Sequence, residues 1–137
     1  MAQHPELIEE PYPFQKLLGF TIVDWTADRV ELHLPVQPDL GNRYGLPHGG
    51  VYASILDTVM GFSGCFTGDV TVKRLAMTLS MNVNFLSRPK GQLLIAEGRK
   101  TGGGRRTFFA EAKVTDETGE LIATGSGTFR YRGEPQT

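Results

Sequence analysis

The segment that most constrains how this chain folds is residues 49–66, which are predicted to form one long helix. Apolar residues cover most of the circumference of this helix. They are Val51, Tyr52, Ile55, Leu56, Val59, Met60 and Phe62. A helix that is apolar nearly all round is normally buried. The rest of the chain is therefore expected to wrap around it.

Much of the remaining sequence is typical of antiparallel strands. Residues 77–85 alternate between apolar and polar side chains, which predicts a strand with one polar face. Further elements are expected as follows: two strands within residues 20–35 around an Ala27-Asp28 turn, strands at 93–100, 107–115 and 121–132, turns at 101–104 and 116–119, a helical turn at 14–18 ending at Gly19, and a loop at 36–48.

These elements predict an α+β fold, in which one long central helix is wrapped by a curved antiparallel β-sheet. The strands after the helix are expected to form a meander. A sheet that buries one face needs an element to cover it, and the helix is available for this. The 137 residues are expected to form a single domain over 1–137, with a loose N-terminal segment at 1–13 and a loose tail at 133–137.

Composition excludes several classes of function. A net charge of -1 gives no basic footprint for nucleic acid and no polybasic signal for a membrane surface. Cys65 is the only cysteine, which rules out an intrachain disulfide and argues against a cysteine-based metal site. The N-terminus lacks the features of a signal peptide, and no apolar run reaches membrane-spanning length. We therefore expect a cytoplasmic protein without a metal.

One carboxylate interrupts the apolar helix. Asp57 lies on a narrow stripe with Gly50, Ser54, Gly61 and Gly64, which are spaced by three and four residues. The stripe could be a solvated outer face. However, each glycine costs a helix about 1 kcal/mol relative to alanine, which an exposed face has no reason to accept. A buried carboxylate that takes part in chemistry is the favoured interpretation.

His48-Gly49-Gly50 precedes the helix. Helix N-termini present unpaired N–H groups and the positive end of the helix dipole, and glycines let an oxygen approach closely. This arrangement is typical of an oxyanion site for acyl transfer, although the glycines could also serve the turn alone.

Asp57 lies roughly 10 Å along the helix axis from Gly50, because a helix rises about 1.5 Å per residue. Both groups cannot easily contact one small reacting group. Two antiparallel copies of the helix would bring Asp57 of one chain to Gly49 of the other. The sequence therefore indicates a symmetric dimer with shared sites.

Asn42, His48-Gly49-Gly50 and Asp57 form the pattern N-x5-HGG-x6-D, and the strand MTLSMNVNFLSRP follows it. With these features the chain resembles the hotdog-fold acyl-CoA thioesterases of the phenylacetate-pathway (PaaI-like) type. The resemblance extends over about residues 15–132. Members of this family have the fold predicted above and form dimers or dimers of dimers.

The resemblance implies a role for each matching residue. Asp57 is expected to be the general base or nucleophile, and the Gly49 backbone N–H the oxyanion donor. The side-chain amide of Asn42 is expected to position the water or the thioester, and His48 to support the site through hydrogen bonds. Thr78 falls where the family often has a serine or threonine near the carboxylate.

Several other residues are candidates for binding the substrate. Gly50 could let the substrate approach the helix N-terminus. Arg105 and Arg106 follow three glycines and could clamp the phosphates of coenzyme A, or they could be solvated residues of a hairpin turn. Arg88 and Lys90 form a second possible phosphate contact, or another charged turn.

The sequence is therefore expected to encode an acyl-CoA thioesterase that needs no cofactor, coenzyme A being part of the substrate. Its partners would be an acyl-CoA and a second copy of the chain, as a homodimer or a homotetramer. A hotdog hydratase or dehydratase acting on acyl-CoA or acyl-carrier-protein thioesters is one alternative, and its product would keep the thioester. A non-catalytic acyl-CoA-binding protein is another, which would bind without turnover.

Overall fold

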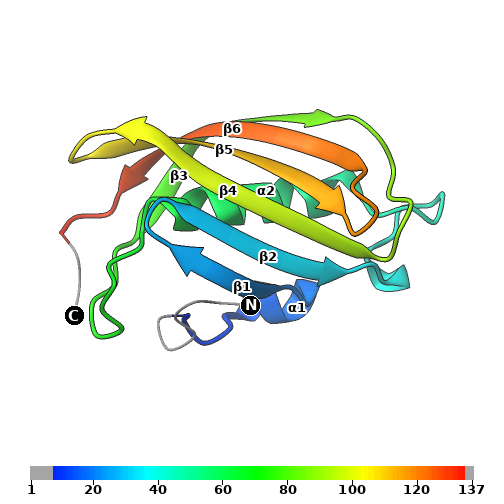
Figure 1. Ribbon diagram of the computed structural model, residues 1–137, viewed down its shortest axis with the longest axis horizontal. Helices are drawn as coiled ribbons and strands as arrows, with labels where there is room; N and C mark the ends of the chain where they lie inside the picture. The colour runs from blue at the N-terminus through cyan, green and yellow to red at the C-terminus, as the bar shows by residue number, and fades with distance from the viewer. Residues whose placement is uncertain (1–7, 135–137) are drawn as a thin grey trace.

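A computed structural model describes residues 8–134, which form one antiparallel sheet curved around one long helix (Figure 1). The elements are α1 (Pro13–Leu18), β1 (Thr21–Thr26), β2 (Arg29–Pro35), η2 (Pro38–Leu40), α2 (Gly49–Ser63), β3 (Ala76–Phe85), β4 (Leu93–Gly103), β5 (Thr107–Asp116) and β6 (Leu121–Tyr131). The six strands lie in the order β1-β2-β4-β5-β6-β3. The predicted fold class is confirmed.

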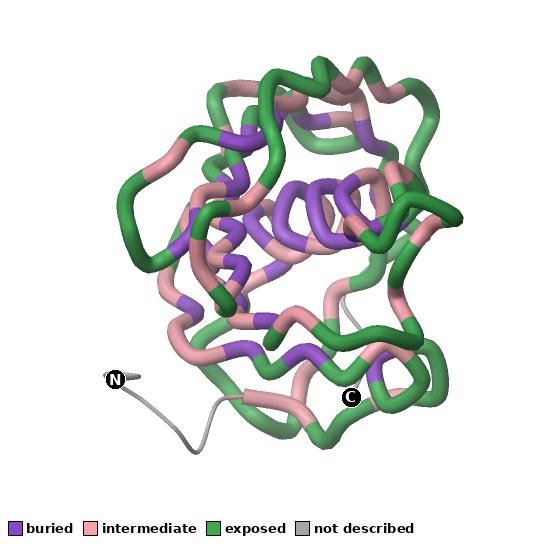
Figure 2. Tube along the Cα trace, turned by 90° about the vertical axis from the view of Figure 1, so that its right-hand side faces the viewer, coloured by how far each residue is buried: buried purple, intermediate pink, exposed green. Residues whose placement is uncertain are grey.

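Helix α2 is enclosed by the concave face of the sheet, as expected of a helix that is apolar on most sides (Figure 2). Ile55, Leu56, Val59 and Met60 have no exposed surface. The helix lies closest to β4 at Gly98, where a methyl group would overlap the backbone carbonyl of Val59. A glycine in β4 therefore sets how closely helix and sheet approach.

All six predicted strands are present, but the predicted meander covers only β4, β5 and β6. Strand β3 pairs with β6, while β4 pairs with β2. The chain therefore crosses the end of the sheet through residues 86–92 before it forms β4. Strand β4 also continues to Gly103, so the turn expected at 101–104 is shorter than predicted.

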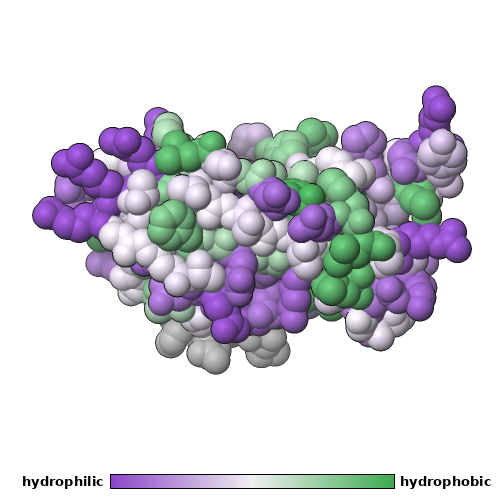
Figure 3. Space-filling view, turned by 90° about the horizontal axis from the view of Figure 1, so that it is seen from above, coloured by the Kyte–Doolittle hydropathy of each residue, from purple (hydrophilic) through white to green (hydrophobic). Residues whose placement is uncertain are grey.

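Strand β3 is one edge of the sheet. Met77, Leu79 and Phe85 on this strand are each about half exposed, at 46%, 52% and 59%. Hydrophobic side chains gather on the face of the molecule seen in Figure 3. An exposed apolar edge strand is a template for pairing with another chain.

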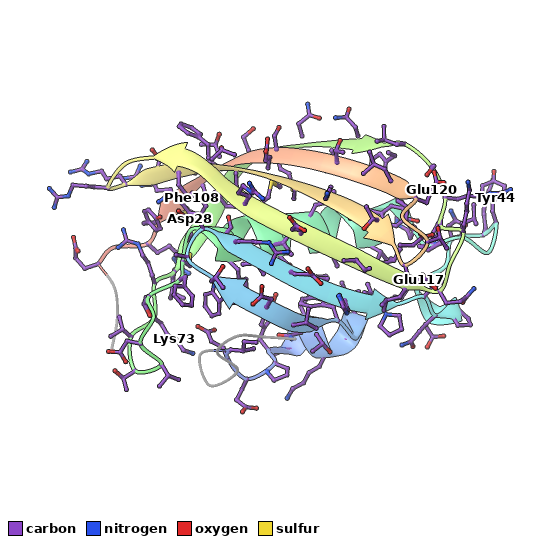
Figure 4. All side chains as sticks on the ribbon, in the orientation of Figure 1. Asp28, Tyr44, Lys73, Phe108, Glu117 and Glu120 are labelled. Atoms are coloured by element: carbon purple, nitrogen blue, oxygen red, sulfur yellow. The ribbon has the colours of Figure 1, made fainter. Side chains whose placement is uncertain are left out.

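The crossing loop at 86–92 is held by carboxylates of the β5–β6 hairpin. Asp116 is buried and accepts hydrogen bonds from the backbone N–H groups of Lys90 (2.7 Å) and Gly91 (2.8 Å). The Thr118 hydroxyl and these N–H groups hold the pKa of Asp116 well below its ordinary value. Glu117 accepts from the next part of the loop and lies at the same end of the molecule (Figure 4). The turn expected at 116–119 thus also fixes the path of the crossing loop.

The described part of the N-terminal segment packs on the core rather than lying loose. Tyr12 stacks on Phe62 with ring centroids 6.4 Å apart and meets Phe20 edge-on. Residues 1–7 and 135–137, which were also expected to be loose, lie outside the described residues. No helix within residues 8–134 is long and apolar enough to cross a membrane.

Candidate active site

The helix carboxylate is hydrogen-bonded to the sheet. The hydroxyl of Thr78 on β3 donates to Asp57 Oδ1 at 2.6 Å. Asp57 is half-buried and Thr78 is exposed, so the pair is accessible to solvent in a single chain. The structure therefore brings together two residues that the sequence placed on different elements. Asp57 Oδ2 has no protein donor among residues 8–134.

Asp57 and Thr78 lie at a pocket of about 220 Å³. Aromatic rings from four elements or loops line it, namely Tyr12, Trp25, Phe62 and Phe129. The wall is fixed, because the Trp25 indole donates to the Phe62 carbonyl at 3.0 Å and the two rings meet edge-on at 5.0 Å. The pocket thus offers an aromatic wall beside a carboxylate, and Glu9, Thr58 and Arg74 make the rest of its lining partly polar.

Cys65 also lines this pocket and is buried. Burial raises the pKa of its thiol to about 11. The thiolate is the nucleophilic form of cysteine, so at neutral pH this side chain is an apolar part of the wall.

His48 caps the N-terminus of α2. Its Nδ1 accepts a hydrogen bond from the Gly50 N–H at 2.8 Å. This fixes the ring as the tautomer with the proton on Nε2. The Gly50 N–H is therefore occupied, whereas the Gly49 N–H has no acceptor within residues 8–134. Of the two glycines, only Gly49 presents a free N–H to a ligand oxygen.

Asn42 shapes the loop that leads into the helix. Its Oδ1 accepts hydrogen bonds from the N–H groups of Tyr44 (2.9 Å) and Leu46 (3.2 Å). The carbonyl of Leu40 accepts from the His48 N–H at 2.8 Å, which closes the loop. The Asn42 amide nitrogen makes no hydrogen bond within residues 8–134, so it remains available as a donor.

Gly49 and Asp57 are eight residues apart on one continuous helix. At about 1.5 Å per residue they are separated by about 12 Å along the helix axis. Within one chain, the free N–H and the carboxylate therefore do not face one small group. This separation agrees with the distance estimated from the sequence.

Of the two glycines at the far end of α2, packing within the chain explains Gly64 but not Gly61. A side chain at Gly64 would overlap the ring of Phe108, and one at Gly61 would lie 3.6 Å from Phe129. At Gly64 the small residue therefore makes room for a core phenylalanine of the same chain.

The predicted phosphate contacts lie at opposite ends of the sheet. Arg105 and Arg106 are in the β4–β5 turn, whereas Arg88 and Lys90 are in the crossing loop. The eleven residues of β4 separate the two groups by about 33 Å, at about 3.3 Å per residue. The Lys90 ammonium pairs with Glu120 at 2.8 Å, which raises the pKa of Lys90.

Sequence reasoning missed two further arginines. Arg74 and Arg130 line a pocket together with Arg105 and Arg106. No local motif marks them, and only the pairing of β3 with β6 brings the segments together. Within residues 8–134, no cluster of three His, Cys, Asp or Glu side chains is arranged to hold a metal ion.

Comparison with known proteins places this geometry in context. The sequence model of the thioesterase superfamily matches residues 44–123, which are 80 of the 137 residues. A conserved protein from Pseudomonas aeruginosa has a similar structure, with a TM-score of 0.80 and 27% identity over 95% of this chain and 99% of that chain. The E. coli PaaI protein from the phenylacetic acid degradation operon gives a TM-score of 0.78 at 19% identity, covering 90% of this chain and 87% of its own.

A relative is also known by its reaction. The 1,4-dihydroxy-2-naphthoyl-CoA hydrolase of Listeria monocytogenes is 23% identical over 118 residues, which cover 86% of this chain and 94% of that protein. With a family match over more than half of its length and the wrapped-helix fold of PaaI, this chain belongs to the thioesterase superfamily of hydrolases and has the hotdog fold.

Proposed function

We propose that this protein hydrolyses acyl-CoA thioesters, with Asp57 as the reacting carboxylate. The observation that carries the proposal is the Thr78–Asp57 hydrogen bond of 2.6 Å in the wall of a pocket lined by four aromatic rings. A pocket of this kind can hold an acyl group while the carboxylate meets the thioester carbon. The CoA hydrolase among the relatives supports coenzyme A as the carrier.

The thioester carbonyl would lie at the N-terminus of α2. Its oxygen gains negative charge as the carbon becomes tetrahedral, and the Gly49 N–H and the helix dipole would stabilise that charge. The free amide nitrogen of Asn42 is a candidate second donor. Removing one such donor typically costs about 10²–10³ in kcat.

Asp57 can act by two routes, both through Oδ2. As a general base it takes a proton from water, the resulting hydroxide adds to the carbonyl carbon, the C–S bond breaks, and the proton passes to the thiolate. As a nucleophile, Oδ2 adds to the carbon and expels the thiolate, and water then cleaves the mixed anhydride. Each route yields a free acid and coenzyme A. Thr78, bound to Oδ1, would orient the carboxylate in both.

A second chain would complete the site, since about 12 Å of helix separates Gly49 from Asp57 in one chain. Strand β3 supports this, because it is an edge strand with exposed Met77, Leu79 and Phe85. Pairing of two β3 strands would satisfy the free backbone groups of this edge and bring the second chain beside the solvent-accessible Thr78–Asp57 pair. We therefore propose a homodimer whose sites each take Asp57 from one chain and Gly49 from its partner.

The test is a panel of acyl-CoA esters assayed for release of free thiol. We expect Asp57→Asn to lower kcat by at least about 10²-fold, as for loss of a general base, while circular dichroism remains that of the wild type. Asp28→Asn in the exposed β1–β2 turn is the matched control and should keep full activity. Hydrolysis by Asp57→Asn at the wild-type rate would refute the role of Asp57.

The same panel separates the other functions. Mass spectrometry that shows a changed acyl chain on an intact thioester would indicate a hydratase instead. Saturable binding of every ester by the wild type without any thiol release would indicate a binding protein.

A further inference from the structure

Four arginine side chains converge at the end of the molecule where β4 turns into β5. They line a pocket of about 410 Å³, together with Tyr131, Gly133 and Glu134. The β4–β5 turn, the end of β6 and the loop before β3 all lie at this end (Figure 1). The side chains are Arg74, Arg105, Arg106 and Arg130.

Sheet register brings these arginines together. Arg130 on β6 lies opposite Met77 of β3 on one side and Thr107 of β5 on the other. The carbonyl of Arg106 accepts from the Tyr131 N–H at 2.8 Å. Arg74 Nη2 donates to the carbonyl of Arg105 at 3.3 Å. Hydrogen bonds among three parts of the chain thus hold the pocket together.

The cluster lacks compensating acids. Within residues 8–134, none of the four guanidinium groups forms an ion pair, and Glu134 is the single acidic residue of the lining. Arg29 shows the contrast, because it contacts three carboxylates at 2.8–3.1 Å. Unpaired like charges repel one another, and a bound anion would relieve this repulsion.

Arg74 is the most firmly held of the four. Its guanidinium lies over the ring of Tyr131, 3.7 Å from the centroid, and its Nε is buried without a partner among the described residues. Arg74 also lines the pocket that contains Asp57. It therefore borders both the arginine pocket and the pocket at Asp57.

We propose that the arginine pocket binds the nucleotide phosphates of the CoA thioester, with Arg74 and Arg130 as binding residues beside Arg105 and Arg106. Guanidinium groups bind phosphate through paired hydrogen bonds. Coenzyme A carries a pyrophosphate and a ribose phosphate, which matches several cations in one pocket. This inference rests on the proposed function and deepens it, because it makes the nucleotide a determinant of which thioesters are hydrolysed.

The distance to the carboxylate suits this assignment. Arg74 precedes Thr78 by four residues, which is about 13 Å of extended chain. The pantetheine arm that joins the thioester to the phosphates is flexible and longer than this. One substrate molecule can therefore reach from the arginine pocket to the Thr78–Asp57 pair.

The direct test measures binding of adenosine 3′,5′-bisphosphate, which carries phosphates but no thioester. Calorimetry should show binding to the wild type that weakens at high salt. We expect Arg130→Gln and Arg106→Gln each to raise Kd by about tenfold or more, because each variant loses a charge-assisted hydrogen-bond pair with a phosphate. Arg99→Gln, on an exposed part of β4, is the matched control and should bind as the wild type does. Absence of binding to the wild type, or equal Kd in all variants, would overturn the proposal.

A kinetic test separates this site from the reaction itself. We compare kcat/KM for an acyl-CoA with kcat/KM for the pantetheine ester of the same acid. The ratio of the two values measures how much the nucleotide phosphates contribute to substrate recognition. We expect Arg130→Gln to lower this ratio about tenfold through KM of the CoA ester. An unchanged ratio would overturn the phosphate site while leaving thioester hydrolysis standing. Bisphosphate binding without hydrolysis of any thioester would instead refute the proposed function and leave the phosphate site in place.

Discussion

At the scale of single residues, the contact that matters most is the hydrogen bond from Thr78 to Asp57. In the proposed reaction, this bond holds one carboxylate oxygen and leaves Oδ2 to react. Hydrogen bonds to charged groups contribute about 1.5–3 kcal/mol. If this bond orients Asp57 in the transition state, its loss slows the reaction rather than weakening substrate binding.

We therefore expect Thr78→Val, which keeps the shape but removes the hydroxyl, to lower kcat by about 10- to 100-fold with KM little changed. Thr78→Ser keeps the donor and is the control, so it should retain most of the wild-type rate. Steady-state kinetics on one CoA ester are sufficient. A Thr78→Val enzyme as fast as Thr78→Ser would show that the hydrogen bond has no part in catalysis.

At the scale of elements, the fit of α2 into the sheet depends on Gly98 of β4. A methyl group there would overlap the Val59 carbonyl, and a backbone group cannot move aside as a flexible side chain could. We expect Gly98→Ala to destabilise the protein by about 1–3 kcal/mol or more, as overpacking of a core does.

Gly104 in the β4–β5 turn provides the control, because a methyl group there would meet nothing within 4 Å. Urea unfolding of Gly98→Ala and Gly104→Ala measures the difference directly. Equal midpoints for the two variants would contradict the close approach of helix and sheet.

The stability that Asp116 provides by anchoring the crossing loop depends on pH. The pKa of folded Asp116 is depressed, so the unfolded chain binds more protons in acid. Its contribution to stability is therefore present above the unfolded pKa of about 3.9 and is lost as pH falls below that value.

We expect Asp116→Asn to lower the urea midpoint at pH 7 and to make it less sensitive to acid. Asp28→Asn is the control, and a wild-type-like pH profile in Asp116→Asn would contradict the anchoring role.

The elements also show what a sequence can predict. Helix α2 followed from its long apolar run, and the six strands followed from alternating side chains and from the turns between them, because these are local properties of each segment. The place of β3 beside β6 did not follow, since it depends on the loop at 86–92 and on an anchor at Asp116 more than twenty residues farther along the chain.

The candidate site was predictable to the extent that it is local. Asn42, His48, Gly49 and Asp57 lie within sixteen residues, so one motif marked them. Arg74 and Arg130 are 56 residues apart, and no local pattern links them. Their common pocket exists only because two strands pair.

At the scale of the whole molecule, hydrophilic and hydrophobic side chains are unevenly distributed over the surface. The end that carries the β4–β5 turn is strongly hydrophilic, while hydrophobic side chains lie along the face seen in Figure 3. The β5–β6 hairpin with Glu117 and Glu120 lies at the other end (Figure 4). A second copy that pairs along β3 would leave both ends open, so that substrate could enter.

A shared site predicts that two different inactive chains restore each other. Gly49 is the first residue of α2, and His48 before it has φ -63° and ψ 141°, which a following proline accepts. Gly49→Pro therefore removes the free N–H while a proline at this position suits the helix start. Gly49→Ala keeps the N–H and adds a side chain, and is the matched control.

The most direct measurement is the activity of a mixed dimer made from Asp57→Asn and Gly49→Pro chains. Each chain carries a different tag, and tandem purification isolates the mixed species alongside both inactive homodimers. One site then contains both defects, whereas the other contains the wild-type Asp57 of one chain and the wild-type Gly49 of its partner. We expect about half of the wild-type activity per dimer, from the one intact site. A verified mixed dimer no more active than its parents would refute a site built from two chains.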